Sequence, residues 1–138
     1  MPSPDVVAAR VQAVLDIPLH RFLGVRLRDP AEPSAGIWFP VDEAAQNQAA
    51  LLHGGVVYTL LDVAGFLALL PSLGDAEHAV THDLSVSLLR PVRAGARVDV
   101  TGSVLRRGRA VAFLRSEATV DGVVVAAGQV TKSVVPAG

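Results

Sequence analysis

The chain has 138 residues, a formal net charge of −1 at pH 7 and no cysteine. This charge balance gives no reason to expect binding to nucleic acid or to an anionic membrane, and the lack of cysteine excludes disulfides, thiolate catalysis and cysteine-ligated zinc. Apolar residues make up 51% of the sequence. In a chain of one predicted domain, residues 1–138, this fraction favours burial of apolar surface between subunits.

The N-terminal quarter predicts a short helix followed by a strand. Pro4 suits a first helical turn, and valines recur at helical spacing within residues 4–15. Residues 21–28 alternate in polarity and are followed by the turn formers Asp29 and Pro30, which predicts a strand. The first residues lack the basic and apolar regions of a signal peptide, so we expect a cytoplasmic protein with its core in residues 18–135.

The most apolar segment predicts a buried helix. Residues 54–70 are apolar on every side of a helix, and the stop signal PSLGD follows them. The wider segment 49–73 is long enough to cross a membrane, but His53 and Asp62 lie inside it. Ionisable groups are costly within a bilayer, so a buried helix in the core is the better interpretation.

Strand-like runs lie on both sides of this helix. Residues 36–41 precede it, and four further runs follow it at residues 79–90, 96–107, 109–120 and 123–135. The last two runs are separated by Asp121-Gly122, which favours a two-residue hairpin turn. One buried helix among antiparallel strands predicts an α+β fold in which a curved antiparallel sheet wraps a long central helix.

The sequence NQAALLHGGVVYTLLD, residues 47–62, places polar residues at the start of the predicted helix. Gly54 and Gly55 open the helix, where backbone N–H groups lack acceptors and the helix dipole is positive. Such groups can stabilise a carbonyl oxygen that gains negative charge. The glycines would equally serve to relieve crowding where the helix meets the sheet.

Asp62 lies eight residues after Gly54, roughly 12 Å along a helix axis. One helix therefore cannot present both groups to the same reacting carbon. Two antiparallel helices related by a two-fold axis could do so, which favours a homodimer with sites at the interface. Asp62 suits a general base or nucleophile, although a buried acid bonded to hydroxyl or backbone groups remains the alternative.

HGGVVYTLLD resembles the HGG-x-x-x-x-x-x-D signature of the PaaI-like acyl-CoA thioesterases of the hotdog-fold superfamily, and Asn47 falls where that family has an asparagine. AVTHDLSVSLLRPVRAG and GRAVAFLRSEATVDGVVVAAGQVT resemble the family's later strands. The resemblance covers residues 18–134. It implies a hotdog fold, a homodimer or a dimer of dimers, and hydrolysis of a small aryl or medium-chain acyl-CoA without metal or cofactor.

The resemblance also implies roles for single residues. Asp62 would be the base or nucleophile, the Gly54 amide would polarise the carbonyl with Gly55 in support, and Asn47 would position the thioester or water. Thr81 would hold the water or the carboxylate, and His53 would orient the loop at the helix start. The arginines that could meet coenzyme A phosphates, or else lie in solvated turns, are Arg90, Arg106, Arg107 and Arg109.

Two other functions remain open from the sequence. A hotdog hydratase or dehydratase would use His53 and Asp62 from opposite subunits as acid and base, and a non-catalytic module would bind acyl-CoA without turnover. The remaining histidines, His20, His78 and His82, share no metal-ligand spacing, so we expect no metal site.

Overall fold

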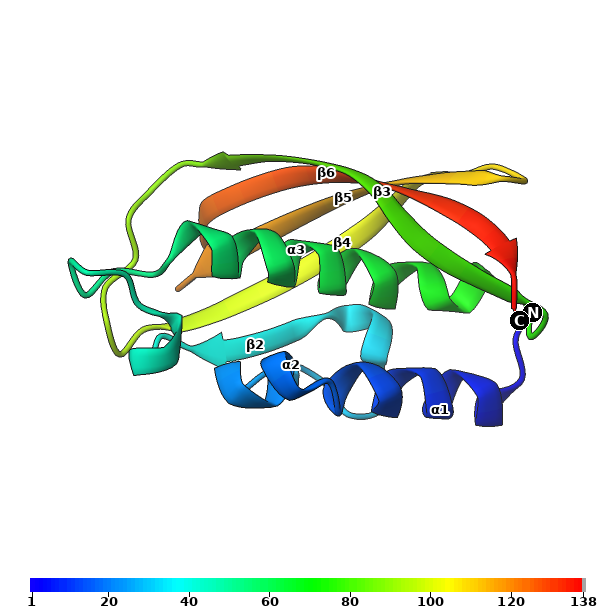
Figure 1. The fold of residues 1–138 in the computed structure, drawn as a ribbon, viewed down its shortest axis with the longest axis horizontal. Coiled ribbons are helices and arrows are strands. Elements are labelled where there is room, and N and C mark those ends of the chain that lie inside the picture. The colour runs from blue at the N-terminus through cyan, green and yellow to red at the C-terminus, as the bar shows by residue number, and fades with distance from the viewer. Residues whose placement is uncertain (138) are drawn as a thin grey trace.

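Helix α3, Gly54–Leu69, runs through the middle of the fold (Figure 1). The computed structural model describes residues 1–137. Two shorter helices, α1 and α2, precede α3, and six strands complete the fold. Their bounds are α1 Pro4–Leu15, α2 Pro18–Leu23, β1 Arg26–Leu27, β2 Ile37–Pro40, β3 Glu77–Leu88, β4 Arg97–Arg107, β5 Val111–Val120 and β6 Val123–Pro136.

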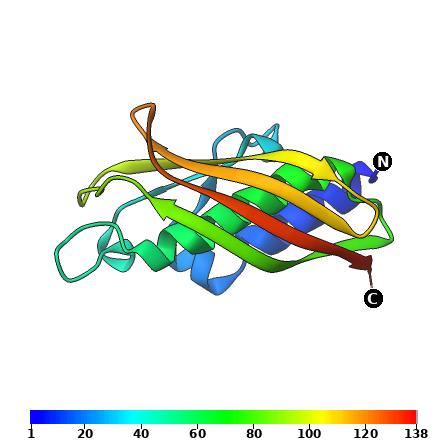
Figure 2. The same ribbon diagram turned by 90° about the horizontal axis from the view of Figure 1, so that it is seen from above.

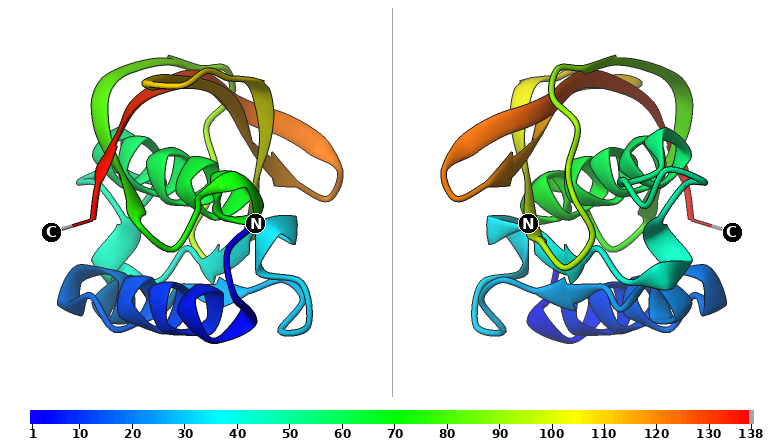
Figure 3. Two further views of the ribbon diagram at one scale, coloured as in Figure 1. Left: turned by 90° about the vertical axis from the view of Figure 1, so that its right-hand side faces the viewer. Right: turned by 90° about the vertical axis from the view of Figure 1, so that its left-hand side faces the viewer.

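All six strands form one antiparallel sheet in the order β1-β2-β4-β5-β6-β3. The strands cross above α3 at an angle (Figure 2), and in the end-on views the sheet arches over the helix while α1 lies on its other side (Figure 3). Strand β3 is one edge of this sheet. The predicted α+β hotdog arrangement, a long central helix wrapped by a curved antiparallel sheet, is confirmed.

Helix α3 is apolar because it is enclosed. Among residues 1–137, the segment Gly54–Ser72 is long and apolar enough to cross a membrane by length and composition. Half of that window is buried inside the structure, and Leu60, Leu61 and Leu67 are fully buried against the sheet. The apolar surface of the helix is therefore used for packing in the core of the protein.

The predicted strand over residues 21–28 is mostly wrong. The first part of this segment belongs to helix α2, which begins at Pro18 and ends at Leu23; the C-cap residue Gly24 follows in the left-handed conformation, with φ 75°. Only Arg26 and Leu27 pair as a strand. Proline at the first helical position and glycine after the last are a start and a stop signal, and both outweigh the apparent alternation of RFLGVRLR.

Gly102 marks the closest approach of strand β4 to α3. A Cβ atom at Gly102 would lie 2.6 Å from the Ala64 carbonyl oxygen and 3.1 Å from the Gly65 nitrogen. Both neighbours are helix backbone and cannot rotate away, so a side chain here would force the helix off the sheet. The absence of a Cβ at this position lets the sheet close over α3.

Gly102→Ala should therefore lower the free energy of unfolding by about 1–3 kcal/mol, the usual cost of overpacking a core. The matched control is Gly74→Ala, because a Cβ at Gly74 would make only ordinary contact with Glu77, at 3.4 Å. Urea denaturation of both variants measures the difference. Equal stability of the two variants would show that the helix and sheet can separate here without cost.

The start of β3 is anchored by Glu77. Its Oε1 accepts hydrogen bonds from the Gly74 N–H at 2.9 Å and from Arg107 Nη2 at 2.7 Å. The pKa of Glu77 is lowered from its usual value, first by the Gly74 N–H and then by the Arg107 guanidinium. These contacts hold the turn after α3 against the β4–β5 hairpin.

Candidate active site

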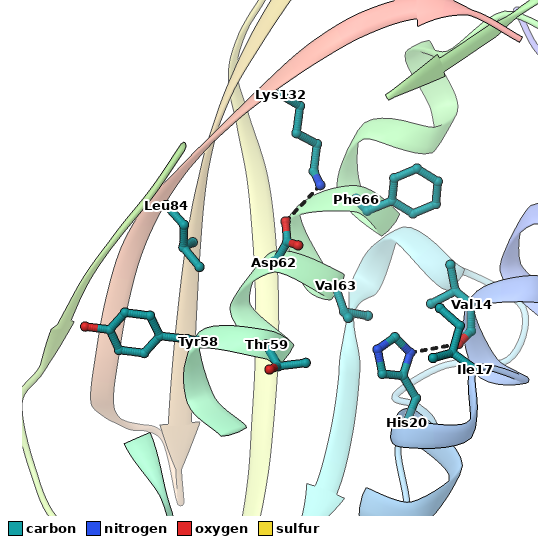
Figure 4. A pocket seen from close by; sticks show the side chains of 10 residues that line it. All are labelled: Val14, Ile17, His20, Tyr58, Thr59, Asp62, Val63, Phe66, Leu84 and Lys132. Atoms are coloured by element: carbon teal, nitrogen blue, oxygen red, sulfur yellow. Dashed lines mark hydrogen bonds and ion pairs between the residues drawn. The ribbon is translucent and has the colours of Figure 1, made fainter. Parts of the chain in front are cut away.

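Asp62 lies near the middle of α3, and its carboxylate is held from the sheet (Figure 4). Its Oδ1 accepts a hydrogen bond from Thr81 Oγ1 at 2.6 Å. The same oxygen forms an ion pair with Lys132 Nζ at 2.9 Å. Lys132 Nζ also donates to Thr81 Oγ1 at 2.6 Å. Within residues 1–137 the second oxygen, Oδ2, has no hydrogen-bond partner. The carboxylate is thus fixed through one oxygen while the other stays available.

The two residues that hold Asp62 face each other across neighbouring strands. Thr81 of β3 pairs with Lys132 of β6, and the register then shifts so that Asp83 pairs with Thr131. His82 is the extra residue of this β-bulge, and its Nδ1 lies 2.7 Å from Ser133 Oγ. A bulge changes which side chains point to which face of a sheet. Here Thr81 and Lys132 both reach Asp62.

Lys132 is a contact of Asp62 that the sequence analysis missed. Only 3% of its surface is exposed, and its ammonium lies 5.5 Å from the centroid of the Phe66 ring. A signal for it does exist in the sequence. The chain contains twelve basic residues, and Lys132 is the sole lysine among eleven arginines. It is the one charged residue of the final strand, β6, which is otherwise composed of apolar and uncharged polar residues.

A cavity of about 420 Å³ opens beside Asp62. Its walls come from α3, from α1, α2 and the short connection between them, and from β3 and β6, as Figure 4 shows. Most of the lining is apolar, and His20 contributes a ring whose Nδ1 lies 2.8 Å from the Val14 carbonyl oxygen. The residues are Val14, Ile17, His20, Tyr58, Thr59, Asp62, Val63, Phe66, Leu84 and Lys132. This volume is in the range of small-molecule sites.

The start of α3 offers one unused backbone donor. His53 is the N-cap residue, and its Nδ1 accepts a hydrogen bond from the Gly55 N–H at 2.9 Å. Its own N–H donates to the Ala45 carbonyl at 2.8 Å. Gly55 therefore has no amide left to support Gly54 at a ligand. In the described part of the chain, the Gly54 N–H makes no hydrogen bond.

Asn47 shapes the loop that leads into α3. Its Oδ1 accepts hydrogen bonds from the N–H groups of Ala49 at 2.9 Å and Leu51 at 3.2 Å. Because these bonds use the oxygen, the amide nitrogen of Asn47 is left to donate elsewhere. Asn47 and Gly54 line the same cavity of about 250 Å³, to which Arg90 and Leu88 also contribute.

The predicted site residues thus fall into two places on one chain. Asp62 lines one cavity and is hydrogen-bonded to Thr81, whereas Asn47 and Gly54 line another cavity. The chain brings Arg90 to the second cavity, while Arg107 binds Glu77 and the Ser72 carbonyl near the far end of α3. Arg106 and Arg109 flank Arg107 at this β4–β5 hairpin. The separation of Asp62 from Gly54 agrees with the helical spacing along α3.

Among residues 1–137, no group of three or more histidine and acidic side chains is placed to hold a metal ion. The two cavities present a fixed carboxylate with one unbonded oxygen, an amide side chain and a backbone N–H at a helix start. A carboxylate can deprotonate water or attack an acyl carbon, and a helix-terminal N–H can stabilise an oxyanion. This set suits acyl transfer to water.

Comparison with protein families decides the class. The family model described as thioesterase superfamily matches residues 50–132, which span the start of α3, Asp62, Thr81 and Lys132. The chain belongs to the thioesterase superfamily. This thioesterase is an enzyme that hydrolyses thioesters, and the resemblance to the PaaI-like hotdog thioesterases is confirmed.

Individual relatives agree with this family. The thioesterase is 34% identical over 122 residues to the medium/long-chain acyl-CoA thioesterase YigI of Escherichia coli, covering 75% of this chain and 76% of that protein. It is 32% identical over 94 residues to human acyl-coenzyme A thioesterase 13, covering 67% and 66%. A solved thioesterase family protein from Silicibacter pomeroyi has a TM-score of 0.81 and 25% identity, with coverage of 95% and 99%.

Proposed function

We propose that this protein is a cytoplasmic acyl-CoA thioesterase that releases coenzyme A and the free acid from a medium-chain or small aryl acyl-CoA. The observation that carries the proposal is the Asp62 carboxylate, tied through Oδ1 to Thr81 and Lys132 while Oδ2 is unbonded beside an apolar cavity. The relatives that hydrolyse acyl-CoA, by their names, support the same substrate class.

The proposed reaction uses Asp62 Oδ2 at the thioester carbon. As a general base, Oδ2 takes a proton from a water molecule whose oxygen bonds to that carbon; as a nucleophile, Oδ2 bonds to the carbon itself. In either route the carbonyl oxygen becomes negative and accepts a hydrogen bond from the Gly54 N–H. The C–S bond then breaks, and coenzyme A leaves as a thiolate that needs no strong acid; in the general-base route the proton held by Asp62 passes to this thiolate or to solvent. In the nucleophilic route water then hydrolyses the mixed anhydride between the acyl group and Asp62, which releases the free acid and restores the carboxylate. Asn47 orients the thioester or water through its amide nitrogen.

A complete site needs two subunits. Thr81, which holds Asp62, and Leu88 both lie on the edge strand β3, and a Cβ at Gly54 would lie 2.9 Å from Leu88 Cδ1. Antiparallel pairing of two β3 edges, about a two-fold axis between Leu84 and Ser85, would set Thr81 of one subunit opposite Leu88 of the other. Asp62 of the first subunit would then approach Gly54 of the second.

The surface of β3 supports this pairing. An unpaired strand edge exposes backbone donors and acceptors that a second copy can satisfy. Val80, Leu88 and Leu89 are about half exposed, at 50%, 53% and 56%, although large apolar side chains gain from burial. We therefore propose a homodimer joined along β3 as the catalytic unit, with a dimer of dimers as the larger assembly.

The acyl group and the coenzyme A would occupy different parts of the joint site. The apolar cavity beside Asp62, with Val63, Phe66 and Leu84 in its walls, suits the acyl group. Arg90, exposed beside Gly54, suits a phosphate of coenzyme A because guanidinium groups bind phosphate well. Arg106 and Arg109 at the β4–β5 hairpin remain further candidates for phosphate binding.

A thiol-release assay over a panel of acyl-CoAs, varied in chain length and in aromatic content, tests the function. We expect time-dependent appearance of free coenzyme A thiol, with the highest kcat/KM for medium-chain or small aryl groups. A change in enoyl absorbance without thiol release would instead indicate a hydratase or dehydratase. Tight binding of acyl-CoA with no product would indicate a non-catalytic binding module.

A further inference from the structure

Lys132 is the one lysine of the chain, and it is buried at the carboxylate of the proposed site. Its ammonium makes two polar contacts, with Asp62 Oδ1 at 2.9 Å and with Thr81 Oγ1 at 2.6 Å. The Phe66 ring lies on a further side, its centroid 5.5 Å from Nζ, so the ammonium also has a cation–π neighbour. In Figure 4 the Lys132 side chain extends from its strand toward Asp62.

This environment is specific for an ammonium group. A lysine carries a compact charge with three donors on a flexible stem, whereas an arginine carries a planar fork that needs room for paired acceptors. Every other basic residue of this chain is arginine, and several of these lie in exposed ion pairs such as Arg97 with Asp99 and Arg115 with Glu117. The one lysine of the chain, Lys132, is the basic residue that contacts Asp62.

The two donors on Asp62 Oδ1 fix the orientation of the carboxylate. Thr81 and Lys132 both bind Oδ1, so rotation of the Asp62 carboxylate would break both contacts at once. The conformation that keeps them leaves Oδ2 as the oxygen available for reaction. Displacements of about 1 Å at a reacting group can cost about 100-fold in rate, so a fixed carboxylate oxygen matters for catalysis.

The positive charge of Lys132 offsets the partial desolvation of the Asp62 carboxylate. A carboxylate beside Phe66, Val63 and Leu84 loses much of the water that would otherwise solvate it. Lys132 supplies the opposite charge from within the sheet, with 3% of its side chain exposed, whereas 35% of the Asp62 side chain is exposed. The two members of the ion pair therefore differ in exposure: the Lys132 ammonium is buried, and the Asp62 carboxylate reaches the cavity.

We propose that Lys132 is a positioning residue of the thioesterase reaction, which holds the Asp62 carboxylate through Oδ1 and neutralises it so that Oδ2 faces the thioester. The proposal rests on the proposed function of Asp62, but the ion pair itself can be tested without turnover. Lys132 acts through Asp62 and Thr81, which receive both polar contacts of its ammonium group.

Lys132→Met, which keeps an unbranched side chain one atom shorter and removes the charge, should lower kcat by about 10- to 100-fold. KM should stay within about threefold of the wild-type value because the acyl and coenzyme A contacts are unchanged. Arg115→Met is the matched control, since it removes an exposed cation of the adjacent strand β5, and its kcat should equal that of the wild type. Equal kcat for Lys132→Met and the wild type would overturn the proposal.

Chemical rescue distinguishes positioning from a structural role. Lys132→Ala removes three methylene groups and the ammonium, which n-propylammonium replaces. Added n-propylammonium should raise kcat of Lys132→Ala at least tenfold, whereas 1-propanol, which lacks the charge, should not, and neither should affect the wild type. A folded Lys132→Ala enzyme whose lost activity responds to neither compound, or to both equally, would show that Lys132 only fills space.

The single lysine also permits a direct test that needs no turnover and no loss of Lys132. Protein labelled with ¹⁵N-lysine contains one side-chain ammonium, which we expect to exchange slowly with water because Lys132 is buried. Asp62→Asn and Thr81→Val should each shift this resonance, and Arg115→Met should not. An unchanged resonance in Asp62→Asn would refute the ion pair. An intact pair in a protein inactive on every acyl-CoA would instead count against the proposed function.

Discussion

Asp62→Asn should lower kcat for acyl-CoA hydrolysis by about 10²- to 10⁴-fold, the range attributed to a positioned acid or base. The amide oxygen of asparagine can still accept from Thr81 and Lys132, as Asp62 Oδ1 does. These two donors would orient the amide so that its nitrogen replaces Oδ2. A group without a free lone pair or charge then faces the thioester, whereas the shape of the site is retained.

Thiol release under saturating acyl-CoA measures this effect, and far-UV circular dichroism with thermal denaturation checks the fold. Asp121→Asn is a suitable control, because Asp121 is an exposed carboxylate in the turn between β5 and β6 and lines neither cavity. We expect full activity in that control. A folded Asp62→Asn enzyme with kcat within tenfold of the wild type would remove Asp62 from the mechanism.

Gly54→Pro should lower kcat by about 10²- to 10³-fold, as the loss of an oxyanion-hole donor does in other enzymes. Gly54 is the first helical residue of α3, a position that proline favours because its N–H has no helical partner. The preceding His53 has φ −70° and ψ 128°, an extended conformation compatible with a following proline. The substitution therefore removes the amide donor while α3 still forms.

Gly54→Ala is the matched control, since it adds the same Cβ but keeps the N–H. The Cβ of either variant meets the flexible end of Leu88, at 2.9 Å, which can move aside. The difference in kcat between proline and alanine then measures the amide. Equal losses in both variants would indicate that crowding at Leu88, and not the missing donor, causes the effect.

Mixing the two inactive variants tests whether the site is shared. In a dimer of one Gly54→Pro and one Asp62→Asn subunit, one of the two sites would combine the intact Asp62 of the first subunit with the intact Gly54 of the second. Random pairing should restore about a quarter of the wild-type activity. Subunit mixing can be verified by mass spectrometry, and no recovery in verified heterodimers would place both groups within one chain.

Most elements of the fold could be predicted from the sequence. The helix predicted over residues 4–15 coincides with α1, and the helix over 54–70 with α3 and its last turn. Apolar periodicity and turn residues also located β3 to β6 within a few residues. The error at residues 21–28 arose because a short helix between Pro18 and Gly24 leaves too few turns for periodicity to be recognised.

The polar residues at the start of α3, and their distance from Asp62, could also be predicted from the sequence. The eight-residue spacing between Gly54 and Asp62 predicted that the two residues lie apart along α3, because helix rise per residue is nearly constant, and they line different cavities. His53 as a residue of the helix-start loop was likewise recognised, and the structure places its ring on the Gly55 amide. Local geometry follows from local sequence where a helix dictates it.

The groups that bind the Asp62 carboxylate could not be predicted from the sequence and are seen only in the folded protein. Thr81 and Lys132 lie 51 residues apart along the chain, and a β-bulge at His82 sets the register that makes them neighbours. Strand register depends on contacts made across the whole sheet, and a shift of one residue turns every side chain to the other face. The helix, the carboxylate within it and its glycine start were predictable from the sequence, whereas the folded sheet places a buried lysine against one oxygen of that carboxylate.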